Sequence, residues 1–173
     1  SQVSGDNLSG FNKAGMILGG FTNKKINKQL SIQFEINYIQ KGSRNPDMKS
    51  TIIENTNSLP HISLHYIEVP LLIKYQQNSS LEYETGIQWA QLINGYYSNL
   101  YGKIENSTNP FINNDFGVLL GLNYKLKESV ILNTRLSSSI LPIGIEDYNV
   151  ETYNANKKGK YNSTLCFTIY YYI

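Results

Sequence analysis

Two histidines and a set of hydroxyl and carboxyl side chains are the residues of this chain most able to do chemistry. His61 and His65 share one face of a predicted strand, with Ser63 between them. Because residues i and i+4 of a strand lie roughly 13 Å apart, the two imidazoles cannot share one metal ion. A serine, His61 and Asp115 could form a hydrolytic site, but no spacing signature predicts one. We therefore expect no catalytic residue, no metal site and no cofactor.

A second group consists of charged residues on the polar faces of predicted strands. They are Glu35, Lys41, Glu68, Lys74, Glu82, Glu84, Lys125 and Arg135. Glu68 and Lys74 lie roughly 20 Å apart along one strand, so their partners must come from other strands. Buried ions need partners of opposite sign, and an arginine can bind two carboxylates. We expect an interior charge network centred on Arg135. The alternatives are a solvated outer face of a soluble sheet and a proton or ion path.

The elements that carry these residues are predicted to be strands, because apolar and polar residues alternate with a period of two. In one segment, Ile32 and Phe34 face one side, whereas Gln33 and Glu35 face the other. We expect strands at about 11–22, 30–42, 61–75, 81–93, 114–126, 129–141 and 160–173. The alternation in 61–75 changes phase near Tyr66, which predicts a bulge there.

The connections between these strands alternate strictly between short and long. The short ones are 23–29, 76–80 and 127–128, and the long ones are 44–60, 94–113 and 142–159. Outer-membrane barrels have short turns on one side and long loops on the other. No apolar run is long enough for a transmembrane helix. The chain is therefore predicted to be all-β, a single domain over residues 1–173 that forms an antiparallel up-and-down transmembrane β-barrel.

The number of visible strands is seven, whereas bacterial barrels of this kind have an even number. The first and last visible strands run in the same direction, so a further strand should precede residue 11. Either the chain has been shortened at its start, or a very short first strand lies in residues 1–3. We expect eight strands, with an interior filled by side chains and no open pore.

The composition limits the partners. Lys and Arg total 15 and Asp and Glu total 13, so no basic footprint for nucleic acid is present. The mean hydropathy of −0.33 is compatible with a barrel, because inward residues are polar. Cys166 is the single cysteine, which excludes an intramolecular disulfide. In the last strand Leu165 and Phe167 alternate with Cys166, so we expect this thiol to face the interior.

Aromatic residues on the apolar faces are predicted to form two rings, one at each interface of a bilayer. The lower ring is Tyr75, Tyr83, Tyr124 and Tyr171, and the upper ring is Tyr38, Trp89, Phe116 and Tyr161. Aromatic strand propensity alone predicts aromatics but not two levels. Tyr96, Tyr97 and Tyr101 belong to a long connection whose composition is typical of adaptable binding loops. The alternative is a simply hydrophilic loop.

Three motifs resemble those of the PorT-like outer membrane β-barrel family. The segment 1–7, followed by the glycine-containing 10–15, resembles the opening of the family. Residues 35–43, Glu-Ile-Asn-Tyr-Ile-Gln-Lys-Gly-Ser, are similar to a strand end, and residues 66–75, Tyr-Ile-Glu-Val-Pro-Leu-Leu-Ile-Lys-Tyr, to its most recognisable strand. The resemblance implies an eight-stranded barrel in the outer membrane of a two-membraned bacterium. Some members serve type 9 secretion and gliding, and the family implies no catalytic residues.

The leading functional hypothesis is a non-enzymatic outer-membrane barrel with a structural or accessory role in a surface or secretion assembly. Its partners would be outer-membrane lipid and other outer-membrane or periplasmic proteins of that assembly. One alternative is a soluble eight-stranded barrel that binds a small apolar ligand, which requires the apolar face to point inward. A second alternative is an outer-membrane lipid-modifying enzyme that uses His61 and Asp115.

Overall fold

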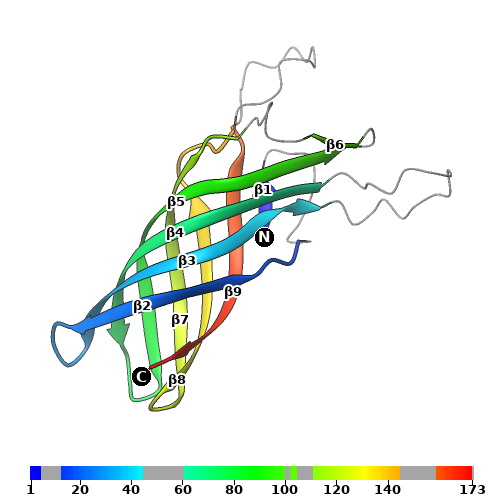
Figure 1. The fold of residues 1–173 in the computed structure, drawn as a ribbon. Helices are drawn as coiled ribbons and strands as arrows, with labels where there is room; N and C mark the ends of the chain where they lie inside the picture. The colour runs from blue at the N-terminus through cyan, green and yellow to red at the C-terminus, as the bar shows by residue number, and fades with distance from the viewer. Residues whose placement is uncertain (5–12, 45–60, 100–101, 105–110, 145–158, 173) are drawn as a thin grey trace.

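The computed structural model describes residues 1–4, 13–44, 61–99, 102–104, 111–144 and 159–172. These residues form one antiparallel sheet (Figure 1). Its strands are β1 (Gln2–Ser4), β2 (Ile17–Lys25), β3 (Leu30–Arg44), β4 (His61–Gln76), β5 (Leu81–Asn99), β6 (Gly102–Ile104), β7 (Asn114–Lys127), β8 (Val130–Ser139) and β9 (Tyr161–Tyr171). The described residues contain no helix long and apolar enough to cross a membrane.

The strand order is that of an up-and-down barrel. The sheet runs β1-β9-β8-β7-β5-β4-β3-β2, and the short β6 pairs with the end of β5 outside this path. The eight antiparallel strands of the path confirm the predicted fold class. The three-residue β1 pairs with β9 through Gln2, Val3 and Ser4. It matches the very short first strand that one of the two alternatives predicted.

The two ends of the path meet through side chains and the Ser1 ammonium group. Ser1 donates a hydrogen bond of 2.8 Å from its ammonium nitrogen to the carbonyl oxygen of Lys13, just before β2. At the lower end, the ring of Phe21 in β2 packs edge-on against Tyr170 and Tyr172, at 5.1 and 4.8 Å between centroids. No ladder joins β2 and β9 among the described residues, so these contacts bring the two strands together.

Two of the short turns are built on asparagine. The Asn27 side-chain oxygen accepts hydrogen bonds from the backbone N–H groups of Gln29 and Leu30 between β2 and β3. Asn78 makes the same pair of bonds to Ser80 and Leu81 between β4 and β5. Such bonds let asparagine reverse the chain within few residues. Because β2 extends to Lys25, the first of these turns is shorter than predicted.

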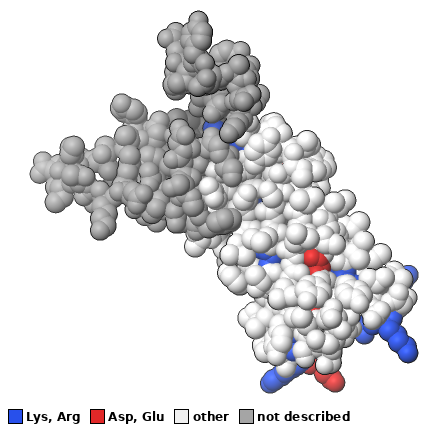
Figure 2. Space-filling model, turned by 180° about the vertical axis from the view of Figure 1, so that it is seen from behind, with Lys and Arg blue, Asp and Glu red and all other residues white. Residues whose placement is uncertain are grey.

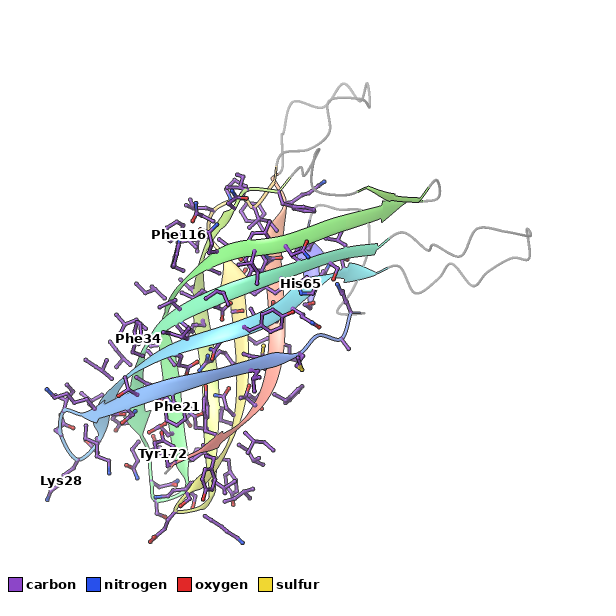
Figure 3. The ribbon with its side chains drawn as sticks, viewed as in Figure 1. Phe21, Lys28, Phe34, His65, Phe116 and Tyr172 are labelled. Carbon is purple, nitrogen blue, oxygen red and sulfur yellow. The ribbon has the colours of Figure 1, made fainter. Side chains whose placement is uncertain are left out.

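The outward face of the sheet is apolar. Leu120 is 65 % exposed and Phe167 is 73 % exposed, and most large aliphatic side chains of the strands point the same way. In Figure 3, Phe34 and Phe116 project away from the strands on the outside. The inward face carries the polar and charged residues. This polarity is the reverse of what the soluble, ligand-binding barrel would require.

The predicted change of phase within β4 is wrong. Ile62, Leu64 and Tyr66 point inward together with Glu68 and Lys74, so the inward parity of this strand stays the same along its length. A register shift does occur beside His65 and Tyr66, but the additional residue lies in β5. What changes along β4 is the type of residue on its inward face, which is charged in the lower part and apolar in the upper part.

This apolar upper interior is a cluster of buried side chains from several strands. Its members are Val3, Ile39, Ile62, Leu64, Tyr66, Ala90, Leu92, Phe111 and Ile143. Each is less than a tenth exposed. The hydrophobic core of the described barrel therefore closes its upper part, on the side of the long connections.

Candidate functional site

Arg135 of β8 lies at the centre of the lower interior. Its two terminal nitrogens each lie 2.9 Å from an oxygen of Glu35 in β3, and its Nε atom lies 2.6 Å from Glu84 in β5. Arg135 also donates a hydrogen bond of 2.7 Å to the hydroxyl of Tyr170, which in turn donates to Glu35 at 2.8 Å. One guanidinium group thus joins residues from four strands across the barrel.

Further polar side chains complete this lower cluster. Lys74 is fully buried, and its Nζ atom lies 3.5 Å from both Glu82 and Glu84. The amide nitrogens of Asn123 and Asn133 each donate a hydrogen bond of 2.9 Å to Glu84. Buried carboxylates are stable only when cations and hydrogen-bond donors surround them. The inward face therefore supplies both kinds of partner to Glu84.

A second ionic cluster lies above the first and beside the apolar core, since Lys41 pairs in register with Leu64 and Asp115 with Ala90. Lys41 of β3 contacts Glu68 of β4 at 2.7 Å and Asp115 of β7 at 3.5 Å, and all three are buried. Asp115 also accepts hydrogen bonds from Ser139 at 2.6 Å and from Asn162 at 2.8 Å. Asp115 was not assigned to the network from sequence, although it shares the inward face of β7 with Gly117 and Gly121, and that parity could have placed it there.

Lys125 does not belong to the interior charge network, contrary to the prediction. It has the inward parity of β7, but it lies at the lower mouth of the barrel and is exposed. It lines an open cavity of about 210 Å³ together with Lys25, Lys28 and Glu128. Water reaches this mouth, so Lys125 needs no buried partner. Glu82 lines the same cavity and its side chain is 24 % exposed, which places it between the mouth and the lower cluster.

Gly121 makes room for the Arg135 cluster, because a Cβ atom there would lie 2.5 Å from the Glu84 carboxylate oxygen. We expect Gly121→Ala to lower the free energy of unfolding by about 1–3 kcal/mol, the usual cost of overpacking a filled interior. Gly20→Ala is the matched control, since nothing lies within 4 Å of its Cβ position. Urea titration in lipid vesicles measures both, and equal values for the two variants would contradict the packing at Gly121.

The upper rim is held by Lys13 and Ser1. The Lys13 ammonium group donates hydrogen bonds to the carbonyl oxygens of Ile62 at 2.8 Å and Lys41 at 3.3 Å. Burial lowers the pKa of Lys13 to about 8, because desolvation disfavours its charged form. The hydroxyl of Ser1 donates to the carbonyl oxygen of Gly42 at 3.0 Å. The Lys13 bonds connect the segment before β2 to β3 and β4, and the Ser1 bond connects the residue before β1 to β3.

The inward charges, the outward apolar band and the up-and-down order together describe a membrane barrel. A family model for the outer membrane protein beta-barrel domain matches residues 6–144, more than half of the chain. The chain belongs to the outer membrane protein beta-barrel domain family. Members reside in the bacterial outer membrane, and this location is therefore assigned to the protein. Searches of curated proteins and of solved structures each found no significant match.

In an outer membrane protein beta-barrel, aromatic residues mark the two interfaces of the bilayer. The four tyrosines predicted for the lower ring are all exposed on the outside, Tyr171 most of all at 66 %. Of the upper set, Trp89 and Phe116 are register partners and exposed, whereas Tyr38 and Tyr161 are half-buried. The Trp89 indole donates to the side-chain oxygen of Asn114 at 3.2 Å. Tyr38 instead contacts His65, at 2.6 Å between its hydroxyl and Nδ1.

The residues considered for hydrolysis are not brought together among the described side chains. Asp115 faces the interior, where Lys41, Ser139 and Asn162 surround it. His65 lies on the outer face beside Tyr38 (Figure 3). The described residues also contain no group of three or more His, Cys, Asp or Glu that could hold a metal ion. The His61 side chain lies outside the described part of the structure.

The three tyrosines proposed for recognition lie at the end of β5 and beyond it. The backbone of Tyr96 pairs with Ser63, and that of Tyr97 with Ile62. Their side chains and the whole of Tyr101 lie outside the described residues. Their part in recognition therefore stays a prediction.

Proposed function

We propose that the protein is a non-enzymatic outer-membrane barrel with a structural or accessory role in a surface or secretion assembly. Its outward apolar band would contact outer-membrane lipid, and its partners would be other outer-membrane or periplasmic proteins. The observation that carries the proposal is the filled interior. A barrel whose lumen is occupied by its own side chains acts through its surfaces, not through a channel.

Both charged and apolar side chains of the described residues fill the interior. The Arg135 cluster occupies the lower interior, and the Lys41 cluster lies above it. Leu72 and Leu119, which both pair in register with Gly86, are buried on the inward face between the two ionic clusters, and the apolar cluster closes the top. An ion path would require hydrated, unpaired charges, whereas these charges bind one another.

The resemblance to PorT-like barrels supports a more specific proposal, namely that the assembly is type 9 secretion-like. The most recognisable of the three motifs that carry the resemblance is at residues 66–75, in which Glu68 contacts Lys41 and Lys74 contacts Glu82 and Glu84. The motif therefore supplies interior ion pairs. Partner recognition would fall to the long connections, where Tyr96, Tyr97 and Tyr101 are the anchors we propose.

The assembly role is tested by purifying the affinity-tagged protein from its own outer membrane after mild cross-linking. We expect a defined protein partner to be recovered with the wild type. Changing Tyr96, Tyr97 and Tyr101 together to serine should lower its recovery at least several-fold, because serine removes the large aromatic contact. The matched control changes the same three residues to phenylalanine, which keeps the rings.

Two results would contradict the proposal. One is recovery of lipid alone from cross-linked wild-type membranes, which would remove the assembly role. The other is stepwise ion conductance by the purified barrel in a planar lipid bilayer, which would replace it with a channel function. In both experiments the folded state is checked first by the gel mobility of the unheated protein.

A further inference from the structure

The lower end of the barrel, at the short turns, concentrates positive charge. Its lysines are Lys24, Lys25, Lys28, Lys125 and Lys127, and we call these five residues the lysine collar. All five are exposed. They make up one third of the 15 basic residues of the chain. Glu128 is the exposed acid of the same described turns, so the formal charge there is five minus one, or +4.

The collar comes from two turns that lie at one end of the molecule. Lys24 and Lys25 end β2, Lys28 belongs to the β2–β3 connection, and Lys125 and Lys127 end β7. Lys25, Lys28 and Lys125 line the same lower cavity, which places both groups around one mouth. Figure 2 shows blue side chains projecting from this end at two separate places, below a largely uncharged surface. In Figure 3, Lys28 extends away from the tip of its turn.

Exposed apolar side chains alternate with these lysines. Ile26 follows Lys25 and is 58 % exposed, and Leu126 follows Lys125 and is 52 % exposed. Lys24 pairs in register with Ile32, so it shares the outward face of the barrel. A water-soluble acidic partner would have no need of exposed aliphatic residues at these positions. A membrane interface suits both types, since aliphatic groups enter the acyl region while ammonium groups reach lipid phosphates.

We propose that the lysine collar binds the anionic headgroups of the phospholipid leaflet that the short turns face. It would select phosphatidylglycerol over zwitterionic phosphatidylcholine, because only the former adds net negative charge beside the lysines. The lower tyrosines, which include the exposed Tyr124 and Tyr171, set the depth at which the collar meets that leaflet. This inference depends on the outward apolar band and is independent of the proposed assembly role.

The test measures lipid selectivity at the surface of the full chain in phosphatidylcholine vesicles. Spin-labelled phosphatidylglycerol or phosphatidylcholine is added in trace amounts, and electron paramagnetic resonance gives the motionally restricted fraction of each. We expect the wild type to prefer phosphatidylglycerol several-fold at low salt and less at about 1 M salt, where charges are screened beyond about 3 Å. Changing all five collar lysines to glutamine should bring the preference close to one.

The matched control changes the same five lysines to arginine, which keeps the charge and should keep the preference. Two partial variants, K24Q/K28Q and K125Q/K127Q, should each lose part of it, and they provide the answer if the fivefold glutamine variant does not fold. Equal association of both lipids with the wild type would overturn the proposal. So would lysine-dependent binding of purified peptidoglycan in detergent without any lipid preference, which would make the cell wall the partner.

Discussion

Replacing Arg135 with glutamine is expected to lower the free energy of unfolding of the barrel by about 3–5 kcal/mol. The guanidinium group is 4 % exposed and contacts Glu35 through two nitrogens and Glu84 through a third. Without it, both carboxylates remain buried and lose their nearest cation. An uncompensated buried charge is among the few single changes that destabilise a protein by this much.

The loss is measured by urea titration in lipid vesicles, followed by the fluorescence of Trp89. This residue is the single tryptophan of the chain and faces outward, so its emission reports departure from the bilayer. Lys125→Gln is the matched control and should change stability by less than about 0.5 kcal/mol, because Lys125 is exposed at the mouth.

A compensated variant separates the charge effect from lost packing. Changing Arg135 to methionine together with Glu35→Gln and Glu84→Gln removes the Arg135 charge and both carboxylates that it contacts, while Lys74 keeps Glu82 as its partner. Replacement of a buried ion pair as a whole is often nearly neutral. We expect this triple variant to be more stable than Arg135→Gln alone. If the single variant unfolds like the wild type, the Arg135 cluster does not stabilise the barrel.

Placing an arginine at Leu120 is expected to cost about 2–4 kcal/mol in a bilayer. Leu120 is 65 % exposed on the outward face of β7, midway between Phe116 of the upper aromatic set and Tyr124 of the lower. That position corresponds to the middle of the apolar band, where an ammonium or guanidinium group is farthest from water. The same titration in vesicles measures the effect.

Leu126→Arg is the control on the same strand. Leu126 is also exposed, at 52 %, but it lies at the lower end beside Lys125 and Lys127. Charges near a membrane interface cost only about 0–1 kcal/mol, so this variant should be nearly as stable as the wild type. Equal effects at the two positions would show that the outward band is not embedded in a bilayer.

Several features of the fold and of the candidate site could be predicted from sequence. The period of two identified β3, β4, β5, β7, β8 and β9, but not the short β6 or the extension of β5 to Asn99, both of which lie in the predicted connection 94–113. The alternation of short and long connections indicated an up-and-down barrel. Arg135 was expected at the centre of a charge network because it is the arginine on a predicted inward face. These predictions rest on local patterns, namely alternation along a strand and the spacing of turns, which a sequence displays directly.

Other features could not be read from the chain. Because Ile62 and Leu64 are apolar, the alternation predicted a change of phase in β4, although both residues lie inside the barrel with Glu68. Lys125 has inward parity and yet is exposed, because the barrel ends at its level. Asp115 was considered for catalysis, whereas it contacts Lys41 in the interior. The differences at β4 and Lys125 concern height along the barrel axis, which parity alone does not specify, whereas the inward parity of Asp115 could have placed it in the interior.

For the charged and aromatic residues, the sequence determined some properties and the tertiary structure decided others. The sequence alone determined which residues share a face, because successive side chains of a strand point to opposite sides. Closure and stagger of the strands decided which charges meet, since residues such as Glu35 and Arg135 lie 100 positions apart. Closure also made the upper interior apolar and left the lysines at the lower mouth. The physical reason is that pairing of buried ions depends on distances across the barrel, and those distances exist only once the sheet is closed.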